Sequence, residues 1–264
     1  MRYKIALAQT LTNPECGQNL KTAERLTAEA AAKGAELIVF PEVFLASFPE
    51  NAMLDEKLKA AHETDSPAVD RMRKAAADNG IWMIFGMYEP ASERKNFNTT
   101  IVADDKGLIR SVYHKTHLYD AFNYLESDFN AAGDKLFEPI DTPFCKLGLM
   151  VCYELRFPEI ARHQALNGAD IIIVPAAWSD GEGKLTQLEL LTRSRALENT
   201  VFVAMCDMGR ERVGNSMVVD PLGNVIVRAG REEELLIAEI DTKLIEKTRR
   251  TVPSLANRRP ELYI

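Results

Sequence analysis

The chain has 264 residues, of which 46% are apolar and 27% charged, and its formal net charge at pH 7 is −7. This composition is typical of a folded globular protein, and the acidic balance argues against nucleic acid or an anionic membrane surface as a partner, because each would need a basic face. Apolar runs such as Ile171–Val174 and Val201–Cys206 are too short to span a bilayer, so we expect no transmembrane helix.

Short apolar strands and amphipathic helices alternate along the chain. In chain order we predict a strand at Tyr3–Gln9, a helix at Asn19–Lys33, a strand at Leu37–Phe40, a helix at Pro67–Asn79, strands at Ile81–Gly86, Thr99–Ala103, Ile109–His114 and Lys146–Cys152, a helix at Pro158–Asn167, a strand at Ile171–Val174, a helix at Lys184–Glu198, and strands at Val201–Cys206, Ser216–Val219, Asn224–Arg228 and Leu235–Ile240. Gly34 and Gly80 suit the position that follows a helix end. Neither a linker nor a charge block divides this pattern, so we predict a single domain over residues 1–264.

One segment of the pattern occurs twice. Gly34–Pro41 reads Gly-Ala-Glu-Leu-Ile-Val-Phe-Pro, and Gly168–Pro175 reads Gly-Ala-Asp-Ile-Ile-Ile-Val-Pro, each after a predicted helix. Consecutive apolar residues are typical of strands that are covered on both faces. The repeat indicates two similar halves, with two sheets face to face and helices outside. The simpler alternative is that any helix–glycine–buried-strand unit looks like this.

Common cofactor and metal motifs are missing from the sequence. No Gly-x-Gly-x-x-Gly follows a strand and no Gly-x-x-x-x-Gly-Lys occurs, so we predict no nucleotide site; the absence of Gly-x-Ser-x-Gly argues against a serine hydrolase. His114 and His117 are three residues apart, but no Cys-x-x-Cys or His-Glu-x-x-His accompanies them. We interpret them as a polar pair at a strand end and predict no metal site.

The cysteines and the N-terminus indicate the compartment. Four cysteines in a chain of this length do not make a disulfide framework. The first apolar stretch ends at Gln9, which is too short for a signal peptide. We therefore expect a reducing, cytoplasmic location.

Three reactive side chains stand at the ends of predicted strands. Cys152 ends one strand, and Glu42 and Lys115 follow two others. Open α/β folds place reactive groups at such ends, where backbone N–H groups can also bind an oxyanion. A thiol with a pKa of roughly 8.5 needs a base to become a thiolate at neutral pH. Histidine is the usual base, but His62 and His163 lie in polar helical stretches, which leaves the His114/His117 pair. The alternative base is a carboxylate beside a lysine. The simpler readings are a cysteine that only packs, a turn carboxylate and a solvated lysine.

The segments around these residues resemble the nitrilase superfamily of carbon–nitrogen hydrolases. They are Glu36–Glu42, Tyr113–Asp120 and Val151–Glu159, and the similarity runs from Lys4 to Tyr263. The resemblance implies a four-layer α-β-β-α sandwich, hydrolysis without a cofactor, and a homodimer or larger homo-oligomer that continues the sandwich across subunits.

The resemblance also implies catalytic roles. It assigns Cys152 as the nucleophile that attacks an amide, Glu42 as the general base and Lys115 as the cation that stabilises the oxyanion, together with the Tyr153 backbone N–H. Glu126, in Glu126-Ser127-Asp128, matches the site of a second family glutamate and would support Lys115. The alternative for Glu126 is a surface-loop acid.

The residues after the cysteine are similar to the ω-amidase and deaminated-glutathione-amidase branch. This branch implies a small carboxylate-bearing amide as substrate, with N-carbamoyl amino acids and nitriles as the competing classes and a fold-only interaction protein as a more remote alternative. Arg156 or Arg193 would meet the carboxylate, unless they form structural ion pairs. Trp178 is a pocket wall or a core residue, and 179–184 is a candidate lid. Gln187-Leu188 departs from the His-Trp that the branch often carries, so specificity differs if these side chains touch substrate.

Overall fold

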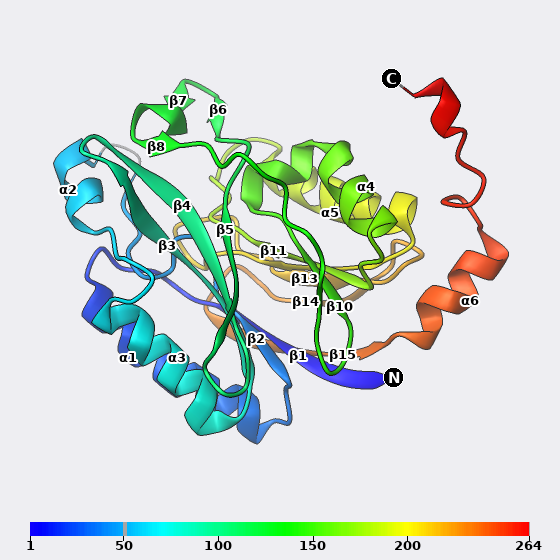
Figure 1. Cartoon of the computed structure of the whole chain (residues 1–264), viewed down its shortest axis with the longest axis horizontal. Helices are drawn as coiled ribbons and strands as arrows, with labels where there is room; N and C mark the ends of the chain where they lie inside the picture. Colours follow the sequence, from blue (N-terminus) through cyan, green and yellow to red (C-terminus); the bar gives the residue numbers. More distant parts are fainter. Residues whose placement is uncertain (50–51, 264) are drawn as a thin grey trace.

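The computed structural model describes residues 1–49 and 52–263. Two β-sheets pack face to face (Figure 1). The first has the strand order β15-β1-β2-β3-β4-β5, and its strands are β15 (Glu234–Asp241), β1 (Arg2–Gln9), β2 (Leu37–Val39), β3 (Trp82–Ser92), β4 (Lys95–Ala103) and β5 (Ile109–His114), with β8 (Asn130–Ala131) paired to β4. The second has the order β14-β13-β12-β11-β10-β9, and its strands are β14 (Val225–Arg228), β13 (Met217–Val219), β12 (Phe202–Cys206), β11 (Ile171–Pro175), β10 (Lys146–Leu149) and β9 (Ile140–Asp141).

Helices cover the outer face of each sheet. Helices α1 (Cys16–Ala32) and α3 (Pro67–Asn79) pack on the first sheet, and α4 (Pro158–Leu166) and α5 (Lys184–Asn199) on the second. The remaining elements are the helices α2 (Leu54–Lys59) and α6 (Lys243–Thr251), the hairpin of β6 (Asp120–Ala121) and β7 (Tyr124–Leu125), and the 3₁₀ turns η1 (Glu126–Asp128), η2 (Cys152–Arg156) and η3 (Pro260–Leu262). The predicted α-β-β-α sandwich is confirmed.

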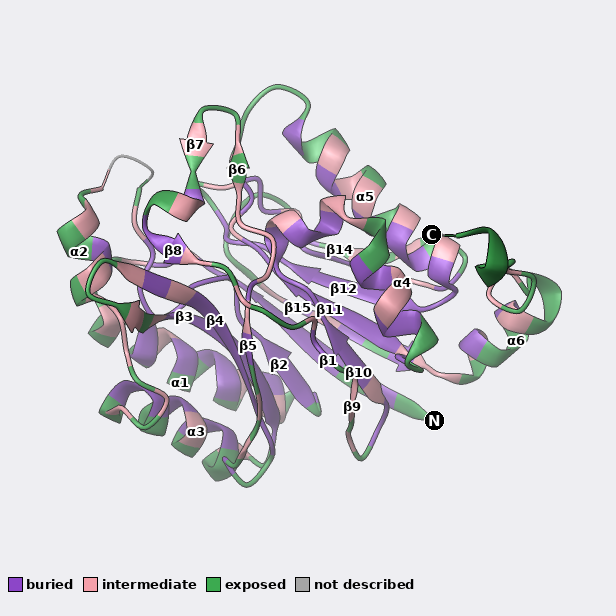
Figure 2. Ribbon diagram, turned by 45° about the horizontal axis from the view of Figure 1, so that its top comes forward, coloured by how far each residue is buried: buried purple, intermediate pink, exposed green. Residues whose placement is uncertain are grey.

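The strand sequences explain the four layers. Along β1, Ile5 and Leu7 belong to the apolar cluster between the sheets, whereas Ala6 and Ala8 belong to the cluster under α1 and α3. Successive side chains of a strand point to opposite faces, so a strand that is apolar at consecutive positions contributes side chains to two apolar cores. Figure 2 accordingly shows buried strands between helices whose outer faces are exposed.

The repeated segment marks equivalent places in the two sheets. Strand β2 lies between the parallel strands β1 and β3, and β11 lies between the parallel strands β10 and β12. Each follows a helix, α1 or α4. The prediction of two similar halves is therefore confirmed.

Most predicted elements are present with shifted ends, and one shift matters for chemistry. The strand predicted to end at Cys152 stops at Leu149, and Cys152 begins the turn η2 with a φ of 47°. It leaves the ladder because the Val151 N–H donates to the Glu154 carboxylate, 2.7 Å away. The short elements α2, β6, β7, β8 and β9 and the polar helix α6 were not predicted, because they are too short or too polar to show a periodic apolar pattern.

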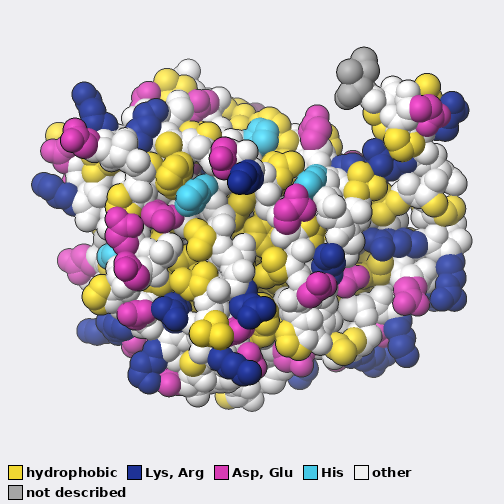
Figure 3. Space-filling view, viewed as in Figure 1, with side chains coloured by type: hydrophobic (Ala, Val, Ile, Leu, Met, Phe, Trp, Pro, Cys, Tyr) yellow, Lys and Arg dark blue, Asp and Glu magenta, His cyan; other side chains and the backbone are white. Residues whose placement is uncertain are grey.

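The distribution of surface charge and the character of the helices agree with the expectations from the composition. Basic and acidic side chains are interspersed over the face shown in Figure 3. Within residues 1–49 and 52–263, no helix combines the length and apolar character needed to cross a bilayer.

Candidate active site

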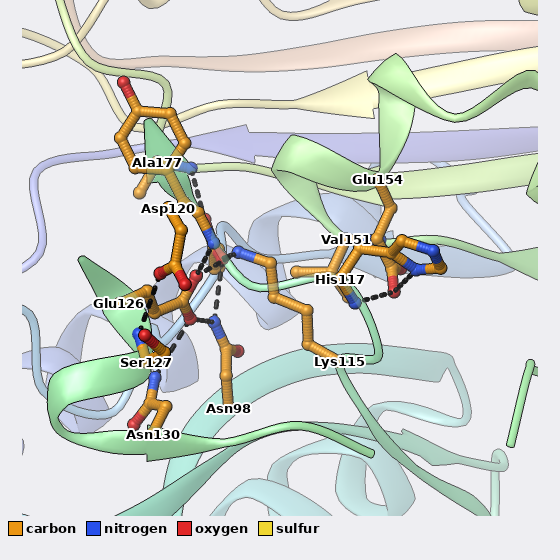
Figure 4. A network of polar contacts seen from close by, with 12 residues as sticks. Asn98, Lys115, His117, Asp120, Glu126, Ser127, Asn130, Val151, Glu154 and Ala177 are labelled. Carbon is orange, nitrogen blue, oxygen red and sulfur yellow. Dashed lines mark hydrogen bonds and ion pairs between the residues drawn. The ribbon is translucent and has the colours of Figure 1, made fainter. Parts of the chain in front are cut away.

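The structure brings together four predicted catalytic residues, Glu42, Lys115, Glu126 and Cys152. Their exposed fractions are 5%, 1%, 5% and 8%, and all four line one cavity. The Lys115 Nζ lies 2.8 Å from Glu42 Oε1 and 2.8 Å from Glu126 Oε2. The alternatives of a solvated lysine and a surface-loop acid are therefore wrong. Figure 4 shows the Lys115 side chain pointing toward Glu126 and its neighbour Asn98.

A strained turn holds Glu42 at the end of β2. The next residue, Val43, has a φ of 43°, a conformation that residues with a β-carbon adopt rarely. The turn packs on β3 at Gly86, where a β-carbon would lie 2.5 Å from the Val43 nitrogen. Glycine at position 86 therefore lets the Glu42 turn approach the sheet closely.

Glu42 joins the two sheets. Its Oε1 accepts from Lys115 Nζ and from Asn98 Nδ2, both at 2.8 Å. Its Oε2 accepts from the Ala177 backbone N–H at 3.0 Å, and Ala177 follows β11 of the second sheet. The carboxylate is thus fixed by partners from both halves of the sandwich.

Glu126 is held equally firmly by partners that sequence reasoning missed. Its Oε2 accepts from the Tyr119 N–H at 2.7 Å, and its Oε1 accepts from Asn98 Nδ2 at 3.1 Å and Asn130 Nδ2 at 2.9 Å. Asn98 therefore bridges both glutamates. The sequence did contain a signal for this role of Asn98, because Asn98 lies in a strand whose residues from Ile101 onward are apolar and therefore buried. A polar side chain that is buried in such a strand needs hydrogen-bond partners.

Charge balance sets the protonation of the cluster. Burial alone would lower the pKa of Lys115, but the carboxylates of Glu126 and Glu42 outweigh it and raise that pKa well above its ordinary value. Burial would raise the pKa of Glu126, but the Lys115 ammonium holds it below the ordinary value. The lysine is therefore a fixed cation and Glu126 an ionised partner.

Cys152 rests as a neutral thiol. Burial and then the negative charge of Glu42 raise its pKa well above the ordinary value, and the Lys115 ammonium and the Ala177 N–H oppose them only in part. A thiolate at this position would therefore form only if the proton passed to a base, and a carboxylate is at hand in the same cluster.

The cavity beside these residues is lined by many aromatic side chains and, besides Lys115, by three cationic ones. It encloses about 670 Å³ of empty space, including its mouth, and its aromatic lining residues are Phe48, Tyr88, Tyr119, Tyr124, Phe129, Tyr153 and Trp178. Trp178 fits both interpretations given above, because it lines the cavity wall and is also buried, with 4% of its surface exposed. Arg156, Lys184 and Arg212 also line the cavity, and sequence reasoning singled out only the first as a ligand for substrate.

Arg156 faces the cavity with its guanidinium 5.1 Å from the Trp178 ring. Its Nη2 donates to Gln187 Oε1 at 2.7 Å, and its Nε is buried without a hydrogen-bond partner. Among the described residues, no carboxylate forms an ion pair with it. Arg193, the alternative, lies outside the cavity lining and pairs with Glu189.

The two residues that depart from the branch pattern, Gln187 and Leu188, lie in different surroundings. Gln187 orients Arg156, whereas Leu188 is fully buried in the main apolar cluster. In the candidate lid, Ser179 and Lys184 line the cavity, and Lys184 Nζ donates to the Tyr119 hydroxyl at 3.2 Å.

The two histidines face different partners. His114 Nε2 lies 2.9 Å from Glu89 Oε2 and its ring stacks on Phe97, whereas His117 Nδ1 lies 2.9 Å from the Thr116 hydroxyl. Across residues 1–49 and 52–263, no group of three or more His, Cys, Asp or Glu side chains is arranged to hold a metal ion.

Comparisons with known proteins agree with this geometry. A family model described as carbon–nitrogen hydrolase matches residues 4–250. The chain is 34% identical to omega-amidase NIT2-A of Xenopus laevis, covering 99% of this chain and 97% of that protein. It is 34% identical to the deaminated glutathione amidase of Escherichia coli O157:H7, covering 97% of each. It spans 62% of the nitrilase and fragile histidine triad fusion protein of Caenorhabditis elegans, at 31% identity.

A solved structure shows a reacted cysteine on the same fold. It is a mutant of the amidase from Nesterenkonia sp. AN1, with the acetamide moiety of fluoroacetamide added covalently at its active site cysteine. The two chains superpose with a TM-score of 0.86 at 26% identity, covering 99% of this chain and 95% of that one.

Proposed function

This chain belongs to the carbon–nitrogen hydrolase family, and on that premise we propose that it hydrolyses small carboxylate-bearing amides, with Cys152 as nucleophile, Glu42 as general base and Lys115 as oxyanion-stabilising cation. The observation that supports these roles is the buried cluster in which the Lys115 ammonium lies 2.8 Å from Glu42 and from Glu126, beside the cavity that Cys152 lines.

The proposed reaction has two halves. Glu42 takes the thiol proton as Cys152 attacks the amide carbonyl, and the oxyanion forms beside Lys115 and the Tyr153 N–H. The protonated Glu42 then gives its proton to the departing ammonia, which leaves a thioester on Cys152. Glu42 next deprotonates a water that attacks the thioester, and the carboxylic acid leaves as the thiol re-forms. Glu126 holds Lys115 in place throughout.

Arg156 supports a carboxylate on the substrate. Its guanidinium lines the cavity, no described carboxylate pairs with it, and its Nε lacks a hydrogen-bond partner. A substrate carboxylate would supply the acceptor and the opposite charge. We therefore expect short ω-amides of dicarboxylic acids, including 2-oxo acids, to be the best substrates.

Ammonia release from a panel of amides, N-carbamoyl amino acids and nitriles tests the reaction class, with Cys152→Ala as the inactive reference. Faster turnover of any nitrile or carbamoyl compound than of every amide would contradict the proposed substrate class. Glutaramic acid and pentanamide form a matched pair that differs in the carboxylate. Arg156→Gln should lower kcat/KM about 100-fold for glutaramic acid, on the scale of a charge-assisted hydrogen bond, and leave pentanamide nearly unchanged. Equal losses for both would contradict the role of Arg156.

We further propose a cytoplasmic homodimer or larger homo-oligomer. Leu190 and Leu197 on the outer helix α5 are 63% and 52% exposed, and the segment after α6 extends away from the body (Figure 1). Burial of such side chains against a second copy would remove apolar surface from water. All four cysteines are free, which suits a reducing compartment. Light scattering on wild type and Leu190→Glu tests the assembly: a monomeric wild type would contradict it.

A further inference from the structure

Besides Glu42 and Glu126, the buried carboxylate of Glu154 lies close to the nucleophile, and it has no role in the reaction steps above. It follows the nucleophile by two residues and is fully buried in the turn η2. A carboxylate without exposure to water is costly unless hydrogen bonds compensate it. Its partners therefore indicate what its burial achieves.

The two oxygens of Glu154 bind two separate segments. Oε2 accepts from the Val151 N–H at 2.7 Å. Oε1 accepts from the Tyr113 hydroxyl at 2.7 Å, from the Thr116 N–H at 2.9 Å and hydroxyl at 2.7 Å, and from the His117 N–H at 3.3 Å. Figure 4 shows Glu154 beside Val151 and His117.

These segments carry the nucleophile and the cation. Val151 directly precedes Cys152, and Thr116 directly follows Lys115. Cys152 has a φ of 47°, so the backbone around it stays in place only if neighbouring contacts determine it. One carboxylate thus spans the gap between the second sheet, after β10, and the first sheet, after β5.

We propose that Glu154 is a positioning residue that fixes the Cys152 thiol relative to the Lys115 ammonium, by binding the backbone beside each. The inference rests on the proposed roles of Cys152 and Lys115. A misplacement of about 1 Å between reacting groups can cost about 100-fold in rate. The effect belongs in kcat, because Glu154 does not line the substrate cavity.

Glu154→Gln is the sharpest test, because it keeps shape and replaces one oxygen by a donor. If the glutamine carbonyl oxygen faces the four donors that Oε1 binds in the wild type, the glutamine NH2 group faces the Val151 N–H. Both groups are then donors, so the hydrogen bond to Val151 is lost. We expect kcat to fall about 100-fold with KM within 2-fold, in protein that circular dichroism shows to be folded at the assay temperature. Tyr113→Phe is the control: it removes one donor, leaves the three backbone bonds of Glu154, and should keep kcat within 3-fold.

A purely structural role predicts a different pattern. Both variants would then lose thermal stability while the folded fraction kept its wild-type kcat, and that result would overturn the proposal. If Glu154→Gln does not fold, Glu154→Asp replaces it: its side chain is one methylene too short to reach both segments, and the same split between kcat and KM is expected. An active Cys152→Ala would contradict the proposed function instead, whatever Glu154 does.

Discussion

The Lys115→Arg substitution asks whether position 115 needs a placed ammonium or only a positive charge. The Lys115 side chain is 1% exposed, and its Nζ contacts Glu42 and Glu126, each at 2.8 Å. A guanidinium is planar and wider than an ammonium, and its donors point in fixed directions. It cannot occupy the same point between the two carboxylates without displacing one of them.

The size of the expected effect follows from the proposed role of the Lys115 ammonium in stabilising the oxyanion. Removing one oxyanion donor costs about 3 kcal/mol of transition-state stabilisation, which corresponds to roughly 100-fold in kcat. Forcing a larger group into a packed site adds about 1–3 kcal/mol of destabilisation to the fold. We therefore expect Lys115→Arg to be nearly as inactive as Lys115→Ala, although it keeps the charge.

Ammonia release from the best amide of the panel, together with thermal unfolding, measures both effects. Lys95→Arg is the matched control, because Lys95 is half-buried and donates to the Ser127 carbonyl near the same cluster, 2.9 Å away, without touching either glutamate. It should keep kcat within 2-fold. A Lys115→Arg variant with a kcat near wild type would refute the argument that the ammonium is a placed group.

Three other outcomes are expected. Iodoacetamide should modify Cys152 at the same time as activity is lost, while Cys145 and Cys206 stay unmodified; mass spectrometry that finds Cys152 intact in inactivated protein would count against its assigned role. Because the pKa of Glu126 is held below its ordinary value, its ionised form stabilises the fold above about pH 4.5, and this contribution is lost as the pH falls through the lowered pKa. The difference in unfolding free energy between wild type and Glu126→Gln should therefore shrink as the pH falls below about 4, and denaturant titrations at several pH values check this; a constant difference would disagree. EDTA should leave the rate unchanged, since the proposed reaction uses only side chains and backbone N–H groups, whereas loss of activity that zinc restores would reopen the role of His114 and His117.

The amino-acid sequence by itself determined the layers and the chemical groups. Apolar residues at consecutive positions in Leu37–Val39 and Ile171–Ile173 require strands that are covered on both faces, and such strands need helices outside and a second sheet inside. The order of Glu42, Lys115 and Cys152, each near a strand end, likewise follows from local pattern and motif. These properties depend on neighbours in the chain, so they can be deduced without coordinates.

Only the tertiary structure decided how those groups are held. Asn98 bridges Glu42 and Glu126, the Ala177 N–H reaches Glu42 from the opposite sheet, and Glu154 takes the Val151 N–H and so ends β10 early. Except for the last contact, these partners lie far apart in sequence. A hydrogen bond between distant residues depends on how the two sheets stack, which no local pattern encodes. The sequence therefore predicts which groups react, while the packing of the two sheets sets their distances, burial and protonation.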